Sequence, residues 1–164
     1  MKLSRRIFLT SAAAALALLA GKSTQARDIV PLAGYQYGAG SIVISTSART
    51  LYYVLGNGQA IRYPVGVGKA GMAWHGQAWV EAKFIRPAWS NPFTHGPRIA
   101  GGDPRNPMGA AVLGLDRGNY AIHGTNDPSS IGGYVSHGCI RMHNEDILDL
   151  YRRVPVGANV YVLR

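Results

Sequence analysis

Cysteine, acidic side chains and long apolar runs are scarce in this chain of 164 residues. Its single cysteine, Cys139, excludes a disulfide within the chain and a zinc site with several cysteine ligands. The sequence also lacks an HExxH motif. The apolar stretch at residues 7–20 has 14 residues, whereas a membrane-spanning helix needs about 20. We therefore expect no stable membrane span.

Acidic residues are outnumbered by basic ones, 8 Asp and Glu against 17 Lys and Arg, which gives a formal net charge of +9. The first 26 residues hold four basic and no acidic residues, so the rest of the chain carries +5. A basic surface suits nucleic acid, an anionic membrane or an anionic polymer such as the cell wall. Because the remaining arginines are scattered singly, apart from Arg152 and Arg153, they form no basic tract. We expect no nucleic-acid partner.

Residues 1–26 are typical of a bacterial export signal. A positively charged start is followed by an Ala- and Leu-rich apolar stretch and by a small-residue cleavage site that ends at Ala26. The adjacent Arg5 and Arg6 resemble the twin-arginine export motif, although a Sec signal with two adjacent arginines gives the same pattern. We expect a periplasmic protein that begins near Arg27 after cleavage.

Glycine and proline, 21 and 9 residues, separate short runs of β-branched and aromatic residues. This composition favours a turn-rich, mostly β fold in one domain. Apolar residues at helical spacing after Asn144 predict one short helix near the C-terminus, with Asn144 as its N-cap. Residues 27–40 look like a short leader, and residues 87–110, dense in Pro, Gly and Asn, predict a long loop. Strands are expected at residues 41–45, 50–55, 59–67, 79–85, 112–115, 120–122 and 159–163.

The residues with chemical potential are concentrated between residues 121 and 143. His123 ends an apolar run, and Cys139 follows a Gly-rich loop, sixteen residues later. A loop of this length can return an imidazole to a thiol, and an adjacent imidazole generates the nucleophilic thiolate. Cysteine and histidine are also zinc ligands, and both are common as inert core residues. From residue types alone, a nucleophile, a zinc site and an inert core pair all stay open.

Two short motifs resemble the signature of the L,D-transpeptidase catalytic domain of the YkuD type. They are His-Gly-Thr at residues 123–125 and Ser-His-Gly-Cys-Ile-Arg-Met at residues 136–142. The resemblance covers about residues 41–164, nearly the whole chain after the signal. Further similar segments are the opening strands at residues 42–53 and 63–69, the Asn-Pro-Met-Gly turn at residues 106–109 and the closing helix and strand at residues 144–162.

This resemblance implies a β-sandwich-type fold with one short helix and a two-step acyl transfer on peptidoglycan stem peptides, without a cofactor or a metal. Cys139 attacks the carbonyl at the L-centre of meso-diaminopimelate and releases the terminal D-Ala. His123 is the general base, with its tautomer fixed by a backbone carbonyl near Gly124. An amine of another stem peptide, or of an outer-membrane protein, then resolves the thioester. Alternatives are resolution by water, which makes a hydrolase, and a wall-binding module without catalysis.

The same resemblance implies roles for other residues of the signature. His137 is the third catalytic residue, and Gly138, Gly124 and Ser136 are oxyanion and orienting groups. Arg141 stands where other members carry Asn. It either binds a substrate carboxylate as a bidentate fork or forms a structural ion pair.

One segment departs from the family pattern. Residues 73–76 read Ala-Trp-His-Gly, where the family has a Thr-Pro-Thr-Gly-like turn. We expect a surface turn here, with Trp74 as an amphipathic side chain on it. Because of its position, the long loop with Trp89 and Phe93 is a candidate flap over the site.

Overall fold

The computed structural model describes residues 27–32, 37–92, 94 and 96–164, so the export signal predicted at residues 1–26 lies outside the described residues, as do Phe93 and His95. Within the described residues, no helix is long and apolar enough to cross a bilayer. The elements are β1 (Asp28–Pro31), β2 (Ile42–Ser45), β3 (Thr50–Gly56), β4 (Gln59–Pro64), β5 (Val67–Gly68), β6 (Gly76–Ile85), β7 (Ala111–Leu115), β8 (Ala121–His123), η1 (Pro128–Ser130), β9 (Tyr134–Ser136), β10 (Ile140–Arg141), α1 (Asn144–Arg153) and β11 (Asn159–Leu163).

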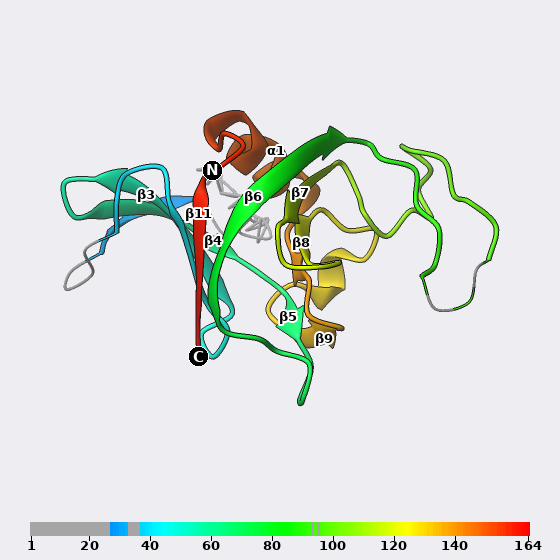
Figure 1. Ribbon diagram of the computed structural model, residues 1–164, viewed down its shortest axis with the longest axis horizontal. Coiled ribbons are helices and arrows are strands. Elements are labelled where there is room, and N and C mark those ends of the chain that lie inside the picture. Colours follow the sequence, from blue (N-terminus) through cyan, green and yellow to red (C-terminus); the bar gives the residue numbers. More distant parts are fainter. Residues whose placement is uncertain (1–26, 33–36, 93, 95) are drawn as a thin grey trace, which may run out of the picture.

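Nine of these strands form one mixed sheet, in the order β1-β4-β3-β2-β11-β6-β7-β8-β10, and β5 pairs with β9 beside it (Figure 1). Strand β6 has ten residues and connects the two halves of the sheet, because it pairs with β11 on one side and with β7 on the other. A register shift between Val80 and Ala82 lies within this shared strand. The prediction of a mostly β fold with one short α-helix near the C-terminus is confirmed.

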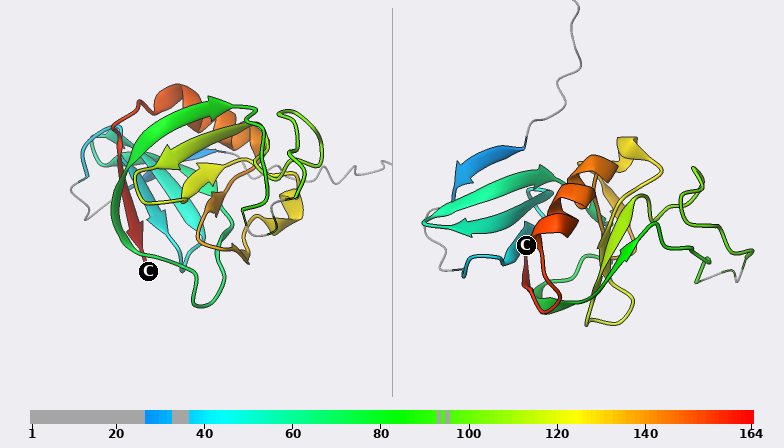
Figure 2. Two further views of the ribbon diagram at one scale, coloured as in Figure 1. Left: turned by 45° about the vertical axis from the view of Figure 1, so that its right-hand side comes forward. Right: turned by 90° about the horizontal axis from the view of Figure 1, so that it is seen from above.

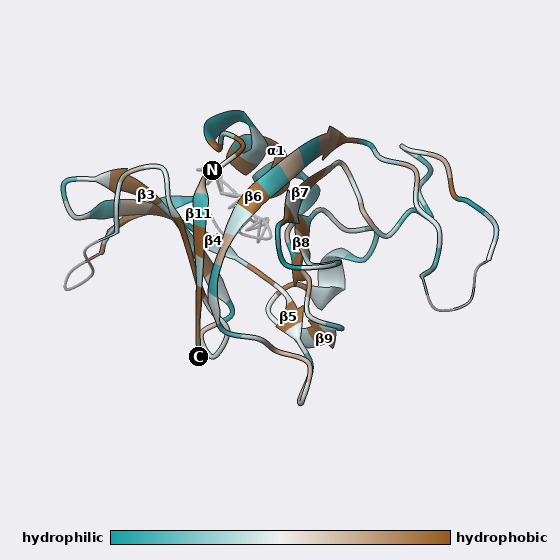
Figure 3. Ribbon diagram, viewed as in Figure 1, coloured by the Kyte–Doolittle hydropathy of each residue, from teal (hydrophilic) through white to brown (hydrophobic). Residues whose placement is uncertain are grey.

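The two halves of the sheet share one apolar core. Leu51 and Val160 from one half and Leu113 and Ile122 from the other are all fully buried in it. Helix α1 covers this core and lies between the β3-β4 hairpin and the β6-β7-β8 half (Figure 2). Colouring by hydropathy shows apolar residues along β7 and β8 and polar ones on the outer turns of α1 (Figure 3).

The predicted apolar stripe of α1 is present, but the predicted N-cap is wrong. Ile147, Leu150 and Val154 are buried in the core. His143 occupies the N-cap position, without a side-chain capping bond, and Asn144 is the first helical residue. The side chain of Asn144 is engaged elsewhere, in contacts described with the site below.

Polar contacts hold α1 against both halves of the sheet. From β4, the Tyr63 hydroxyl donates to the Asp149 carboxylate at 2.6 Å, and Arg153 donates to the same carboxylate at 2.9 Å. From β6, the Lys83 ammonium donates to the carbonyls of Tyr151 and Val154 at the C-terminal end of α1. A cation suits this end of a helix, where the last carbonyls lack intrahelical partners.

Part of the segment that we expected to be a leader forms β1, which pairs antiparallel with β4. Its four residues, Asp28–Pro31, are too few to show a hydrophobic period. Pro31 is compatible with this position because β1 lies at the edge of the sheet. Next to the strand, the Arg27 guanidinium donates to Asp146 on α1 at 2.9 Å.

Candidate active site

The parallel pairing of β10 with β8 brings the two signature motifs together. Arg141 pairs with His123 and Ile140 with Ile122, which sets Cys139 beside Ala121. Since side chains alternate along a strand, the residues at 121, 123, 139 and 141 are directed to one side of this pair. All four line one cavity of about 810 Å³. The fifteen residues between His123 and Cys139 therefore fold back as the sequence predicts.

His123 is a buried imidazole with a defined tautomer. Its side chain is 3% exposed, and Nδ1 lies 2.6 Å from the carbonyl oxygen of Gly124. A carbonyl can only accept, so in the neutral ring Nδ1 carries the proton and Nε2 has the lone pair. Burial lowers the pKa of His123 to about 4, helped by the positive charge of Arg141 and opposed by the carbonyls of Gly124 and Pro107. At neutral pH the ring is uncharged and able to accept a proton.

Cys139 is a partly buried thiol that lines the same cavity as His123. Its Sγ lies 3.7 Å from the carbonyl oxygen of Asn119. Burial raises the pKa of Cys139, while a backbone hydrogen bond at Ala121 and the charge of Arg141 act in the other direction. Because the net shift is upward, the resting sulfur is a thiol, and attack requires a base to take its proton.

The turn that carries Cys139 is fixed by its own hydrogen bonds. The Ser136 hydroxyl accepts from the Gly138 amide at 3.0 Å and donates to the Cys139 carbonyl at 2.6 Å. Gly138 has a φ of 123°, a region that side chains disfavour, and a Cβ here would collide with the Tyr120 ring. Glycine at position 138 is therefore required by both conformation and space.

Trp74 lies under this turn, so its predicted place on a surface turn is wrong. The side chain is 9% exposed, and its indole Nε1 donates to the Gly138 carbonyl at 3.0 Å. Its ring stacks on Tyr120, with 5.4 Å between centroids and 5° between planes, and Arg117 lies 5.1 Å from its centroid. The fold buries it because β5, which precedes the turn, pairs with β9, which leads into Ser136. A Trp between Ala73 and His75 carries no specific signal of such a role.

Asn144 ties the start of α1 to the two loops behind His123. Its side-chain oxygen accepts from the amides of Ala110 and Thr125 at 3.0 and 3.1 Å, and its nitrogen donates to the Thr125 carbonyl at 2.9 Å. Gly109 has a φ of 64°, and a Cβ on either Gly109 or Gly124 would run into this asparagine. Gly124 thus contributes its carbonyl to His123 and the space that Asn144 occupies.

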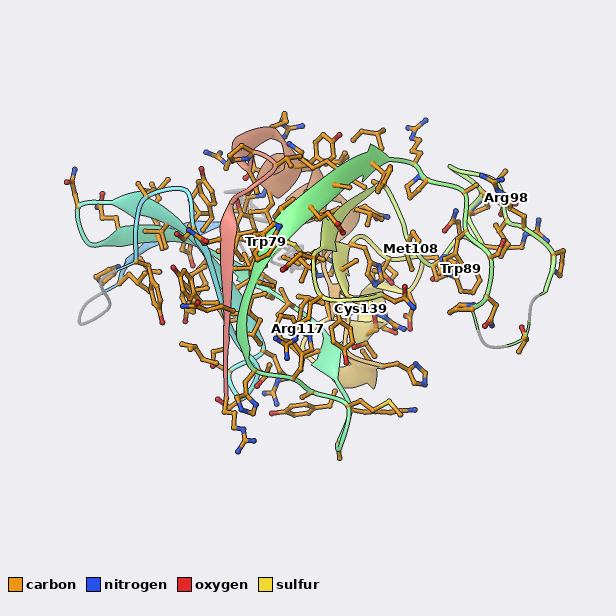
Figure 4. All side chains as sticks on the ribbon, viewed as in Figure 1. Trp79, Trp89, Arg98, Met108, Arg117 and Cys139 are labelled. Carbon is orange, nitrogen blue, oxygen red and sulfur yellow. The ribbon has the colours of Figure 1, made fainter. Side chains whose placement is uncertain are left out.

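The long loop between β6 and β7 forms another wall of the cavity. Trp89 and Met108 line the cavity together with Cys139. In Figure 4, Trp89 and Met108 lie to the right of Cys139, toward the loop that projects from the sheet. Asn106, 2% exposed, stabilises the base of the loop, because its side-chain nitrogen donates to the carbonyls of Pro87 and Ala100 at 2.9 and 3.1 Å. The predicted loop is present, and its action as a flap stays a prediction.

Two further residues of the signature, His137 and Arg141, also line the cavity. His137 lines it as an exposed side chain, and Arg141 lines it beside His123. No ion pair among the described residues involves Arg141, so the contacts do not favour the structural alternative for it. Arg117 is a second cation in the wall, and the lining includes no acidic residue. Across the described part of the chain, no three His, Cys, Asp or Glu side chains are grouped so that they could hold a metal ion.

The family model and the curated relatives that match this chain agree on one family. Residues 39–162 match the family model of the YkuD L,D-transpeptidase catalytic domain. YqjB of Bacillus subtilis, named as an L,D-transpeptidase, is 36% identical over 138 residues, which cover 80% of this chain and 73% of that protein. YbiS of Escherichia coli, named likewise, is 38% identical over 135 residues, 74% of this chain but 43% of that protein.

Solved structures agree on the fold. A crystal structure of an L,D-transpeptidase from Mycobacterium tuberculosis H37Rv aligns with a TM-score of 0.62 at 20% identity, covering 77% of this chain and 58% of that one. At this identity the likeness concerns the fold alone. The matches to the family model and to YqjB extend over most of the chain. This chain belongs to the YkuD family of L,D-transpeptidase catalytic domains, which are acyltransferases.

Proposed function

We propose that this protein is an exported transpeptidase that forms a thioester between Cys139 and a peptidoglycan tetrapeptide stem and passes the acyl group to an amine. The observation that carries the proposal is the shared cavity of a thiol and a neutral imidazole, with the Cys139 turn held rigid. Membership of the YkuD family supplies the reaction class.

In the first step, Nε2 of His123 accepts the thiol proton as Sγ of Cys139 attacks the carbonyl at the L-centre of meso-diaminopimelate. A C–S bond forms, and the electron pair of the carbonyl moves onto its oxygen. When that oxygen returns its electrons, the C–N bond to D-Ala breaks and His123 hands the proton to the leaving amine. The buried ring is uncharged at neutral pH, so its lone pair is available for the thiol proton, and its low pKa favours passing that proton on to the leaving amine.

In the second step, an amine attacks the thioester and forms a C–N bond while His123 takes the amine proton. The C–S bond then breaks, and His123 returns the proton to Sγ of Cys139, which restores the thiol. A side-chain amine of a second stem peptide, or an amine of an outer-membrane protein, fits this role. Water would give a carboxypeptidase instead. A wall-binding module without catalysis is the weaker alternative, since binding requires no thiol beside an imidazole.

The cavity suits an anionic peptide. Its volume of about 810 Å³ is in the range of sites for small molecules and peptide segments. Arg117 and Arg141 supply the positive charge in its wall. A guanidinium binds a carboxylate through two parallel hydrogen bonds, and the stem peptide presents carboxylates next to the reacting carbonyl. We place this reaction in the periplasm, where the signal at residues 1–26 would deliver the enzyme.

Strained β-lactam carbonyls should acylate the same thiol. One structure of a related fold is an L,D-transpeptidase in complex with imipenem, and another, L,D-transpeptidase 3 from Mycobacterium tuberculosis, is in complex with a faropenem-derived adduct. By analogy, we expect imipenem to form a covalent adduct on Cys139 that is absent from Cys139→Ala.

The distribution of products tests the choice of acceptor. Purified protein would be incubated with a tetrapeptide donor and excess diaminopimelate-containing acceptor, and the products weighed by mass spectrometry. The proposal predicts loss of D-Ala and a cross-linked product that exceeds tripeptide. With His123→Ala the rate should fall by about 100-fold or more. Tripeptide alone, with every amine tried, would identify a hydrolase.

A further inference from the structure

We propose that Trp74 is a positioning residue of the acylation step: its indole N–H fixes the Gly138 carbonyl and thereby aims the Cys139 amide at the oxygen of the attacked acyl group. The inference rests on the proposed function, because it concerns the same thioester-forming reaction. Trp74 does not line the cavity, so it acts through the peptide unit between residues 138 and 139 and does not contact substrate.

Peptide geometry links the two groups. In a trans peptide unit the carbonyl oxygen of one residue and the amide hydrogen of the next lie in one plane on opposite sides of the C–N bond. A bond that holds the Gly138 carbonyl toward Trp74 therefore directs the Cys139 N–H away from Trp74. This N–H belongs to the residue whose sulfur attacks, so it lies close to the oxygen on which negative charge develops.

The other polar groups of this peptide segment already have partners. Ser136 holds the Gly138 amide and the Cys139 carbonyl, and Trp74 holds the Gly138 carbonyl. Among the residues that the structure describes, the Cys139 amide has no acceptor. A donor that is oriented but left open is what stabilisation of an oxyanion requires, because it needs no rearrangement when the charge appears.

Aromatic packing holds Trp74 in the position from which its indole donates to the Gly138 carbonyl. The indole stacks in parallel on Tyr120, and the Tyr120 ring also fills the space beside the Cα of Gly138. The Gly138 peptide is thus limited by a ring on its Cα and by a hydrogen bond on its oxygen. Phenylalanine at position 74 can retain the stacking on Tyr120 but has no N–H donor. The variant Trp74→Phe therefore separates the contribution of stacking from that of the hydrogen bond to Gly138.

Two reactions of the same sulfur distinguish positioning from general packing. Acylation by imipenem passes through a tetrahedral oxyanion, whereas alkylation by iodoacetamide displaces iodide and forms none. For Trp74→Phe we expect acylation to slow by about 10- to 100-fold, since loss of one direct oxyanion donor costs about 100- to 1,000-fold. The alkylation rate and its pH profile should stay within about twofold of the wild type. Both rates would be followed by intact-protein mass spectrometry.

Trp79→Phe is the matched control, because Trp79 is 53% exposed on β6 and does not line the cavity. It should change neither rate. If Trp74→Phe fails to fold, 3-benzothienylalanine at position 74 keeps the bicyclic ring and replaces the N–H by sulfur, and the same selective loss is expected. Equal loss in both reactions, or loss in neither, would overturn the inference. Wild-type protein that is alkylated but not acylated at Cys139 would instead refute the proposed function, and the inference with it.

Discussion

Burial acts in opposite directions on the protonation of His123 and Cys139, and both effects favour the uncharged form. Removal from water penalises imidazolium in one residue and thiolate in the other. The resting site therefore holds a neutral thiol and a neutral imidazole in one cavity, and in the proposed mechanism the charged pair forms only during attack. Arg141 favours ionised Cys139 but disfavours protonated His123, so its two effects on proton transfer from the thiol to the imidazole oppose each other.

The depressed pKa of His123 predicts a specific loss of stability in acid. An unfolded histidine has a pKa of about 6.5, whereas the buried ring has a pKa of about 4. The unfolded chain therefore binds more protons between these values, so stability is complete above about pH 6.5 and is lost as pH falls toward 4. Between pH 7 and 4.5 the free energy of unfolding of the wild type should fall by about 2–3 kcal/mol more than that of His123→Gln.

Urea unfolding of both proteins at the two pH values measures this difference. His75→Gln is the control, because His75 is exposed and should retain the wild-type dependence on pH. An unfolding free energy of His123→Gln that falls as steeply as that of the wild type would show that His123 is not the titrating group.

The residues of the site differ in how far the sequence could predict them. His123, Cys139 and Ser136 lie in motifs whose spacing is specific, and the structure gathers them at one cavity. Trp74 could not be predicted, because its partner Gly138 is 64 residues away and only the pairing of β5 with β9 brings them together. Side-chain roles that depend on distant pairing leave no local pattern.

At the scale of elements, the junction between α1 and the loops behind His123 depends on Asn144. Asn144→Ala would remove the acceptor for two loop amides and the donor to a third backbone group. Because water can replace part of these hydrogen bonds at the exposed start of the helix, we expect the free energy of unfolding to fall by about 1–2 kcal/mol. The carbonyl of Gly124 should then orient His123 less well, so acylation by imipenem should slow about tenfold.

Asn126→Ala is the matched control for this variant. Asn126 is exposed in the same region and donates one long bond, 3.2 Å, to the Arg105 carbonyl. Asn126→Ala should lower the free energy of unfolding by less than about 0.5 kcal/mol. Thermal unfolding and adduct formation, measured on both variants, check the prediction, and equal behaviour of the two would argue that Asn144 does not organise the site.

The longer elements could be predicted and the shortest ones could not. The β3-β4 hairpin, β6 and the buried stripe of α1 follow from periodicity and turn residues. Strands β5 and β10 have two residues each, and β9 has three, so they contain too little sequence for a period. They exist because the Gly-rich connection folds back, which pairs β10 with β8 and β9 with β5, and this is a property of the tertiary structure.

At the scale of the whole molecule, the two halves of the sheet and α1 support the candidate site, and strands β8 and β10, which carry its proposed catalytic residues, lie at one end of the strand order. This end adjoins the long loop, so the cavity opens between a regular sheet and an irregular wall (Figures 1 and 4). A rigid scaffold with a loop as one wall is a common arrangement for catalysis.

Export of the molecule is predicted from residues 1–26. Replacement of Arg5 and Arg6 by Lys keeps the charge but removes the paired arginines that a twin-arginine receptor reads. We expect the wild type in the periplasm, shortened to begin near Arg27, and the variant retained in the cytoplasm at full length. Cell fractionation with mass determination checks both. Export of the variant would indicate a Sec signal, and a full-length cytoplasmic wild type would exclude export by either route.

The claim at the centre of this account is that Cys139 carries the acyl group. The most direct measurement is peptide mapping by mass spectrometry after rapid acid quench of enzyme mixed with tetrapeptide donor and no acceptor. We predict a mass increase equal to the tripeptide acyl group on the peptide that contains Cys139, one D-Ala released per adduct, and neither event in Cys139→Ala. Release of D-Ala by Cys139→Ala at the wild-type rate, or an adduct on any other residue, would contradict the account.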